Sequence, residues 1–295
     1  MPSFPGQSGN KEKTKLIGDI KNTVKINIMV ENEKEYATHL NTLIKQGEFL
    51  KICQKEQQDP IWKSFIHNLK KGTMKFLLNS VLDTLPTKTN LKLWSKTTSD
   101  KCNLCSNKET TLHVLNGCRT ALTQGRYTWR HDNILRYICN SINKEKFSVF
   151  SDIPDFQSEN GGTIPSYLTI TADRPDIVLI DKEKNTAKIC ELTVPFETNI
   201  QARHTYKSDK YAYLINDITT FKASLCAFEI GSRGSITNEN IERLKEIYKF
   251  CDKTLKFKTF CENISAISIT SSYYIFNCRK EPSWTILGPL CPPLK

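Results

Sequence analysis

Four cysteine and histidine side chains in one short polar segment constrain this sequence more than any other feature. The segment reads C-x2-C-x7-H-x4-C, with Cys102, Cys105, His113 and Cys118 as its metal-binding residue types. Three thiolates and one imidazole at this spacing suit a tetrahedral Zn²⁺ ion. A closed set of four ligands leaves no open position, so we interpret the site as structural rather than catalytic. The alternative, a chance cluster among the eleven cysteines of the chain, is disfavoured by the compact spacing.

A zinc knuckle of this kind has two roles that the sequence does not separate. It can contact single-stranded or structured nucleic acid, or it can hold two helical segments together. The chain carries 42 Lys plus Arg against 31 Asp plus Glu, a formal charge of +11. That excess favours an acidic partner, and nucleic acid is the commonest one.

Two apolar segments farther along the chain predict a β-hairpin that carries two acids. The polar stretch DKEKNT separates the segments RPDIVLI and AKICELTV. If Ile180 lies opposite Ala187, then Asp176 lies opposite Glu191 on the same face, with Cβ atoms about 5 Å apart. Two carboxylates so placed can bind Mg²⁺ or Mn²⁺, which polarises a phosphodiester and activates water. The alternative is two exposed acids at strand ends, but both interrupt apolar strands, where an uncompensated charge is costly.

Two lysines on the next predicted helix are candidates to assist these acids. A cation stabilises the charge that develops during phosphodiester attack, yet the strand position two residues after the second acid is Thr193. The following helix, at about 200–218, has an apolar face on which Lys207 falls near the middle and Lys210 near the edge. We expect Lys207 to reach the acids, with Lys210 as the alternate.

The rest of the sequence predicts a helical N-terminal part and then a mixed α/β domain. Residues 1–15, rich in Gly, Ser, Pro and Lys, are expected to be disordered, and residues 16–98 to form a basic helical segment with an apolar stripe from Trp62 to Leu69. No apolar run approaches the roughly 20 residues that span a membrane, and no secretory signal is visible, so we expect an intracellular chain with reduced thiols. Helices are expected at about 133–142, 200–218 and 240–256, and strands at 167–171, 177–180, 187–194 and 225–230.

The order of these motifs resembles one protein family. The CCHC knuckle is followed by Arg130-His131-Asp132 and then by the Pro175-Asp176…Glu191 hairpin with its downstream K-x-x-K-Y, and the stretch DTLPTKTNLKLW precedes the knuckle. Together these features resemble the C-terminal region of site-specific non-LTR retrotransposon polyproteins, which carry a restriction-like endonuclease. The resemblance covers roughly residues 60–235.

The resemblance implies an α+β chain in which a zinc knuckle at residues 99–125 precedes a restriction-like endonuclease domain of the PD-(D/E)xK type at residues 126–295. It implies a metal-dependent hydrolase that nicks chromosomal DNA in the nucleus. In the family, the 3′ end of the nick primes reverse transcription of the element RNA, so DNA and element RNA are the implied partners.

The resemblance also assigns roles to individual residues. Asp176 and Glu191 would hold Mg²⁺ or Mn²⁺, Lys207 or Lys210 would be the relocated lysine, and Glu197 would be an auxiliary acid. The sequence has no Tyr-x-Asp-Asp polymerase motif, so we expect a fragment, a truncated copy or a domesticated derivative that cannot itself polymerise.

A nucleic-acid surface is expected beside the nuclease centre. Arg126, Arg130 and His131 closely follow the knuckle and Arg233 lies in a Gly-Ser-Arg-Gly turn, so we expect them to form a basic surface with lysines of the first hundred residues. Two rival interpretations remain. In one the nuclease has decayed to a nucleic-acid-binding zinc module, and in the other the chain is an RNA-binding subunit of a retroelement particle.

Overall fold

A four-stranded mixed sheet lies between two layers of helices. The computed structural model describes residues 8–43, 46–57, 59–285, 288 and 290. The strands follow one another in the order β1–β2–β3–β4; the first three are antiparallel, and β4 is parallel to β3. The fold is therefore α+β, as predicted. The strands are β1 (Ser148–Ser151), β2 (Ile177–Asp181), β3 (Thr186–Thr193) and β4 (Lys222–Glu229).

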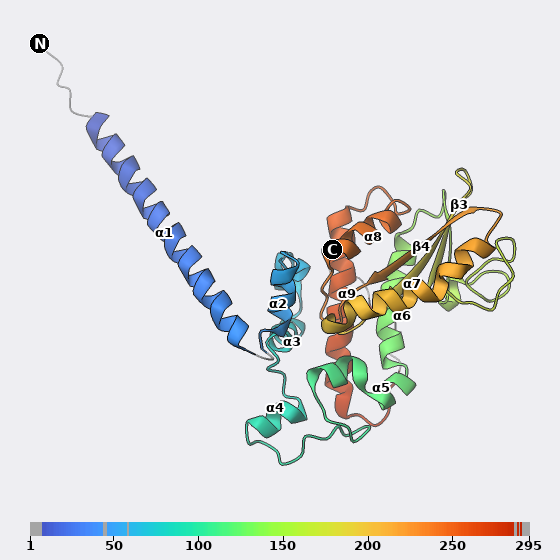
Figure 1. Ribbon diagram of the computed structural model, residues 1–295, viewed down its shortest axis with the longest axis horizontal. Coiled ribbons are helices and arrows are strands. Elements are labelled where there is room, and N and C mark those ends of the chain that lie inside the picture. The colour runs from blue at the N-terminus through green and yellow to red at the C-terminus, as the bar shows by residue number, and fades with distance from the viewer. Residues whose placement is uncertain (1–7, 44–45, 58, 286–287, 289, 291–295) are drawn as a thin grey trace, which may run out of the picture.

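Helices cover both faces of the sheet, which explains why every residue of β2 is buried. On one face α7 (Ile200–Asp217), the crossover between β3 and β4, buries Tyr211 and Leu214 against Val178 and Ile189. The other face packs against three further helices in the main core. These are α6 (Arg126–Ser141), α8 (Asn238–Tyr248) and α9 (Phe257–Asn277), and Figure 1 shows α6 and α9 running side by side.

The N-terminal part packs on α9. Trp62 and Leu77 form a second core with Ala266 and Ile269 of that helix. The expected stripe from Trp62 to Leu69 is not one α-helix, because Phe65, at φ −128° and ψ 4°, separates two short 3₁₀ turns. The elements here are α2 (Glu48–Lys55), η1 (Ile61–Ser64), η2 (Ile66–Asn68), α3 (Lys71–Val81) and α4 (Lys88–Leu93).

The first helix, α1 (Ser8–Thr42), extends away from the rest of the molecule (Figure 1). It begins inside the segment that was expected to be disordered, so that expectation is wrong for residues 8–15, while residues 1–7 lie outside the described part. No helix among the described residues is long and apolar enough to cross a membrane.

Two expected elements differ from those observed, and two observed elements were not predicted. Residues 167–171 form a turn and irregular backbone, and the first strand is instead β1, which was not predicted. The helix expected at 240–256 ends at Tyr248, and the buried 21-residue helix α9 was not predicted at all. The remaining short elements are η3 (His113–Gly117), α5 (Arg119–Thr123), η4 (Pro154–Phe156), η5 (Glu197–Asn199) and η6 (Cys278–Lys280).

Candidate active site and metal-binding cluster

Asp176 and Glu191 meet where β2 begins and β3 ends. The hairpin has the predicted register, with Ile180 opposite Ala187. The backbone N–H of Asp176 donates to Oε1 of Glu191 at 3.1 Å, and that of Leu192 donates to Oδ2 of Asp176 at 2.7 Å. Both side chains are largely buried: the exposed fraction is 13% for Asp176 and 0% for Glu191. The hairpin thus joins two buried carboxylates in one hydrogen-bonded network.

Lys207 reaches this network from α7. Its Nζ atom donates to Oε2 of Glu191 at 2.6 Å. Burial acts to lower the pKa of Lys207, but the charges of Asp176 and Glu191 outweigh it and the pKa is raised, so the amine stays protonated. Lys210 does not reach the acids. Its Nζ donates to the hydroxyl of Tyr211 at 2.8 Å and lies over that ring.

His131 contacts Asp176 from α6. Its Nε2 atom lies 3.2 Å from Oδ2 of Asp176, and its Nδ1 lies 3.1 Å from Oδ1 of Asp132. Burial opposes ionisation of Asp176, but the His131 charge holds the pKa of that carboxyl below its usual value. Burial, together with the Asp176 charge, raises the pKa of Glu191 to about 7. Two carboxylates with pKa values pushed apart are typical of acid–base sites.

Asp176 and Lys207 line a cleft with a volume of about 390 Å³. Its wall combines the end of β3 with α6, α7 and the turn η3 between His113 and Cys118. The polar residues lining it are Asn116, Thr128, Arg130, His131, Asp132, Asp152, Asp176, Thr193 and Lys207.

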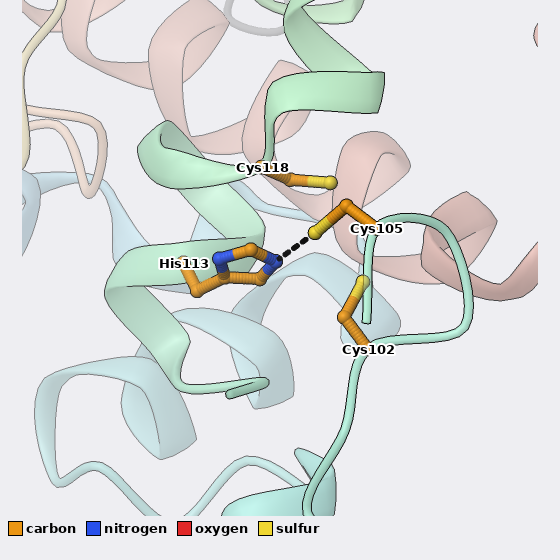
Figure 2. Close-up of side chains that lie close together, drawn as sticks. All are labelled: Cys102, Cys105, His113 and Cys118. Carbon is orange, nitrogen blue, oxygen red and sulfur yellow. Dashed lines mark hydrogen bonds between the residues drawn. The ribbon is translucent and has the colours of Figure 1, made fainter. Parts of the chain in front are cut away.

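The four cysteine and histidine residues also converge, as Figure 2 shows. Their ligand atoms all lie within 4.8 Å of one another, and Sγ of Cys105 is 3.3 Å from Nε2 of His113. Burial lowers the pKa of His113, which favours the neutral imidazole that binds a metal. Cys102, Cys105, His113 and Cys118 therefore form a cluster that could bind a metal ion such as zinc.

Local backbone geometry builds this cluster. An isolated bridge pairs Lys101 with Lys108, so the chain doubles back between Cys102 and His113. The chain then passes through η3, one turn of π-helix, and reaches Cys118. The Tyr127 hydroxyl accepts a hydrogen bond from the Cys118 N–H at 3.0 Å and lies 3.0 Å from the carbonyl oxygen of Val114. Since Tyr127 belongs to α6, the cluster is fastened to the helix that also carries His131.

The prediction of a basic surface is wrong for Arg126 and Arg130, the two arginines that follow the knuckle. Arg126 is 0% and Arg130 1% exposed. Arg126 donates to the carbonyl oxygens of Cys278 and Glu281 at 2.5 and 2.7 Å. Arg130 donates to Oγ of Ser272 and to the Val194 carbonyl, both at 3.0 Å. These side chains connect segments far apart in the sequence and are not part of an exposed basic surface.

Glu197 and Arg233 are also placed differently from the prediction. Nε of Arg233 donates to Oε2 of Glu197 at 2.6 Å and its backbone N–H donates to Oε1 at 2.7 Å. Both side chains are buried, at 0% and 3% exposed. Both carboxylate oxygens of Glu197 are thus used by Arg233, so the geometry assigns this pair to the stability of the fold and not to an auxiliary acid or a nucleic-acid contact.

A second polar cluster was missed from the sequence. Nδ1 of His204 lies 3.1 Å from Oε1 of the buried Glu229, and Arg243 lies 3.2 Å from the other carboxylate oxygen. Glu229 is the last residue of β4, and the strand pattern alone did not indicate a functional side chain there. Helical periodicity could have indicated this cluster, because His204 precedes Lys207 by one turn and lies on the same sheet-facing side of the helix.

No family model matches this chain, and no curated protein matches it. The functional assignment therefore rests on the contacts within the chain.

Proposed function

We propose that the chain is a metal-dependent DNA endonuclease of the PD-(D/E)xK type that nicks DNA. The observation that carries the proposal is the convergence of Asp176, Glu191 and Lys207 at one end of the sheet, beside an open cleft. Two acids and a lysine at the edge of a mixed sheet are the groups that metal-assisted phosphodiester hydrolysis needs.

The donor set fits a hard divalent cation. Among the described residues, hydrogen-bond donors contact Oδ2 of Asp176 and both oxygens of Glu191, while no donor contacts Oδ1 of Asp176. That oxygen, with the lone pairs left on its neighbours, suits Mg²⁺ or Mn²⁺, which usually keeps several water ligands. When bound, the ion would polarise the phosphodiester and activate water. Lys207 would hold its positive charge beside the developing phosphorane, and His131 would orient Asp176.

The Cys/His cluster supports a structural zinc ion in the same proposal. Its three sulfurs and one nitrogen are the donors that zinc prefers, and four protein ligands leave no position for a substrate. Asn116, from the turn between two of the ligands, donates to the carbonyl oxygen of Val194 at the end of β3 at 2.7 Å. A zinc ion would therefore hold the wall of the nuclease cleft in place.

The biological setting of the proposal comes from the resemblance described above. In it, the nick supplies a 3′ end that primes reverse transcription of a retrotransposon RNA in the nucleus, and a polymerase outside this chain performs that step. The two acids, the lysine and the CCHC cluster occur in the order that this setting requires.

Nicking of supercoiled plasmid tests the proposal. With Mg²⁺ or Mn²⁺ the full chain should yield open-circular DNA, and Asp176→Asn or Glu191→Gln should abolish the product while DNA binding without metal is retained. Asp209→Asn is the matched control, because Asp209 lies on α7 but is exposed. A chain that binds DNA but never nicks it, or an Asp176→Asn variant as fast as the wild type, would overturn the proposal in favour of a decayed nucleic-acid-binding zinc module.

A further inference from the structure

Two exposed apolar residues lie at the C-terminal end of helix α4, next to the Cys/His cluster. Leu93 is 69% exposed and Trp94 is 44% exposed, whereas the other tryptophans are buried or half-buried. Burial would stabilise a large aromatic side chain by a few kilocalories per mole, so an exposed tryptophan at a fixed position indicates a contact surface. In Figure 1, α4 stands at the lower end of the molecule, separated from the sheet.

The segment around Trp94 is strongly basic. Between residues 84 and 123 the sequence has six Lys and Arg residues but only two acids. One acid, Glu109, is buried and accepts a hydrogen bond from the Lys88 backbone. The other, Asp100, lies 3.6 Å from Lys92. The cations are Lys88, Lys92, Lys96, Lys101, Lys108 and Arg119, and all but Lys88 are exposed.

Hydrogen bonds fix this basic segment as one surface. The Thr89 N–H donates to the Glu109 carbonyl at 3.2 Å, and the Thr87 hydroxyl caps α4 by accepting from the Asn90 N–H at 3.3 Å. The bridge between Lys101 and Lys108 holds both lysines on the doubled loop of the cluster. The positive charges therefore keep their positions relative to the tryptophan, and Nζ of Lys96 lies 5.8 Å from its ring centroid.

We propose that α4 and the Cys/His loop form a binding platform for single-stranded nucleic acid, in which Trp94 stacks on a base and the surrounding lysines contact phosphates. An exposed aromatic ring among fixed cations is the arrangement that binds single strands without sequence preference. A duplex keeps its bases stacked inside and offers the ring no partner. The platform is separate from the nuclease centre, since none of its residues lines the cleft that contains Asp176.

Tryptophan fluorescence tests the platform directly. The full zinc-loaded chain, without Mg²⁺, is titrated with 15-nucleotide oligo-U, oligo-dT and a 15-base-pair duplex. Both single strands should quench the fluorescence. In a parallel anisotropy titration with the same ligands carrying a 5′ dye, Trp94→Ala should bind the single strands about tenfold or more weakly, as expected for loss of one stacked base, and should bind the duplex as the wild type does. Tyr206→Ala, which removes another exposed aromatic residue (60% exposed) from α7, should bind as the wild type does.

The lysines provide an independent readout. Lys96→Gln with Lys101→Gln should reduce the slope of log affinity against log salt by roughly 0.7 for each phosphate that the variant no longer neutralises. Circular dichroism and thermal unfolding should match the wild type, because both lysines are exposed. Equal binding of oligo-U and oligo-dT supports the stacking site for either source, and tighter oligo-U binding supports an RNA ligand. Wild-type affinity for single strands in Trp94→Ala, or an equal loss of duplex affinity in that variant, would overturn the platform without bearing on nicking.

Discussion

The amine of Lys207 lies 2.6 Å from Oε2 of Glu191, so a helix supplies the cation that the strand itself lacks. In the proposed PD-(D/E)xK pattern the cation would come from a strand position that here holds Thr193, whose hydroxyl is buried and has no hydrogen-bond partner among the described residues. The helix can replace it because α7 begins just after β3, and Lys207 stands two turns into α7, on the face that packs against the sheet. A helix, and not the strand, therefore carries the positive charge beside Glu191.

Lys207 should therefore matter to nicking far more than its neighbour does. Lys207→Met is expected to lower the nicking rate by about 10²–10³-fold, the usual effect of removing one preorganised electrostatic contact. Lys210→Met, three residues away, should stay within a few-fold of the wild type, because its amine contacts Tyr211 instead of the acids. Single-turnover nicking at saturating Mg²⁺ measures both. Equal losses in the two variants would contradict the assignment.

The candidate site could be predicted where local rules decide geometry. A polar turn of fixed length sets hairpin register, so the opposition of Asp176 and Glu191 followed from the sequence. Helical periodicity likewise separated Lys207 from Lys210. The spacing of the four cysteine and histidine residues is equally local, and their ligand atoms do converge.

Features that depend on long-range packing could not be predicted. A sequence shows that Arg130 is charged but not that Ser272, far along the chain, will accept its hydrogen bond inside the core. Helix α9 was not predicted because other elements pack against it on many sides. It therefore lacks the polar face that would give its sequence an amphipathic helical periodicity. His131 was expected to contact nucleic acid, whereas only the folded structure reveals that it faces Asp176.

The buried Arg233–Glu197 pair should control stability rather than activity. Arg233→Met leaves the Glu197 carboxylate buried with only the backbone N–H of residue 233 as a partner and no compensating charge, and should lower the free energy of unfolding by about 3–5 kcal/mol. The double variant Glu197→Met/Arg233→Met should recover much of that loss, since it buries no charge. Urea unfolding measures each step of this double-mutant cycle.

An exposed ion pair provides the control for that cycle. Lys245 and Glu242 lie 2.6 Å apart but are 49% and 69% exposed, so Lys245→Met should change stability by at most about 1 kcal/mol. A similar small effect of Arg233→Met would contradict the structural role of the buried pair.

Removal of metal should expose the cluster thiols selectively. Purified chain should release one equivalent of zinc to a strong chelator, after which Cys102, Cys105 and Cys118 become alkylated by iodoacetamide at neutral pH. Mass spectrometry of the tryptic peptides identifies the modified residues. His113→Ala should lose zinc more readily, whereas Cys53→Ala, a half-buried thiol outside the cluster, should bind zinc normally. Protection of the three thiols that is unchanged by chelation would contradict the metal site.

The pH dependence of stability should report the buried thiols. Burial raises the pKa of Cys139, Cys251 and Cys261 to about 12, while a thiol in the unfolded chain ionises near its ordinary value of about 8.5. Because the folded-state pKa lies above the unfolded one, the stabilisation is fully present below about pH 8 and is lost as the pH rises toward 12. Each thiol should steepen the fall in unfolding free energy by up to about 1.4 kcal/mol per pH unit in that window.

Urea unfolding between pH 7 and 10.5 separates this effect from the titration of lysines and tyrosines. A triple variant with alanine at the three positions is less stable at every pH, because each substitution leaves a small cavity, but its free energy of unfolding should fall less steeply above pH 8.5. The informative quantity is the difference in slope, since cavities change stability without changing proton uptake. If wild type and triple variant lose stability in parallel up to pH 10.5, the thiols ionise equally in the folded and unfolded states, and the core around α9 is more accessible to water than the structure indicates.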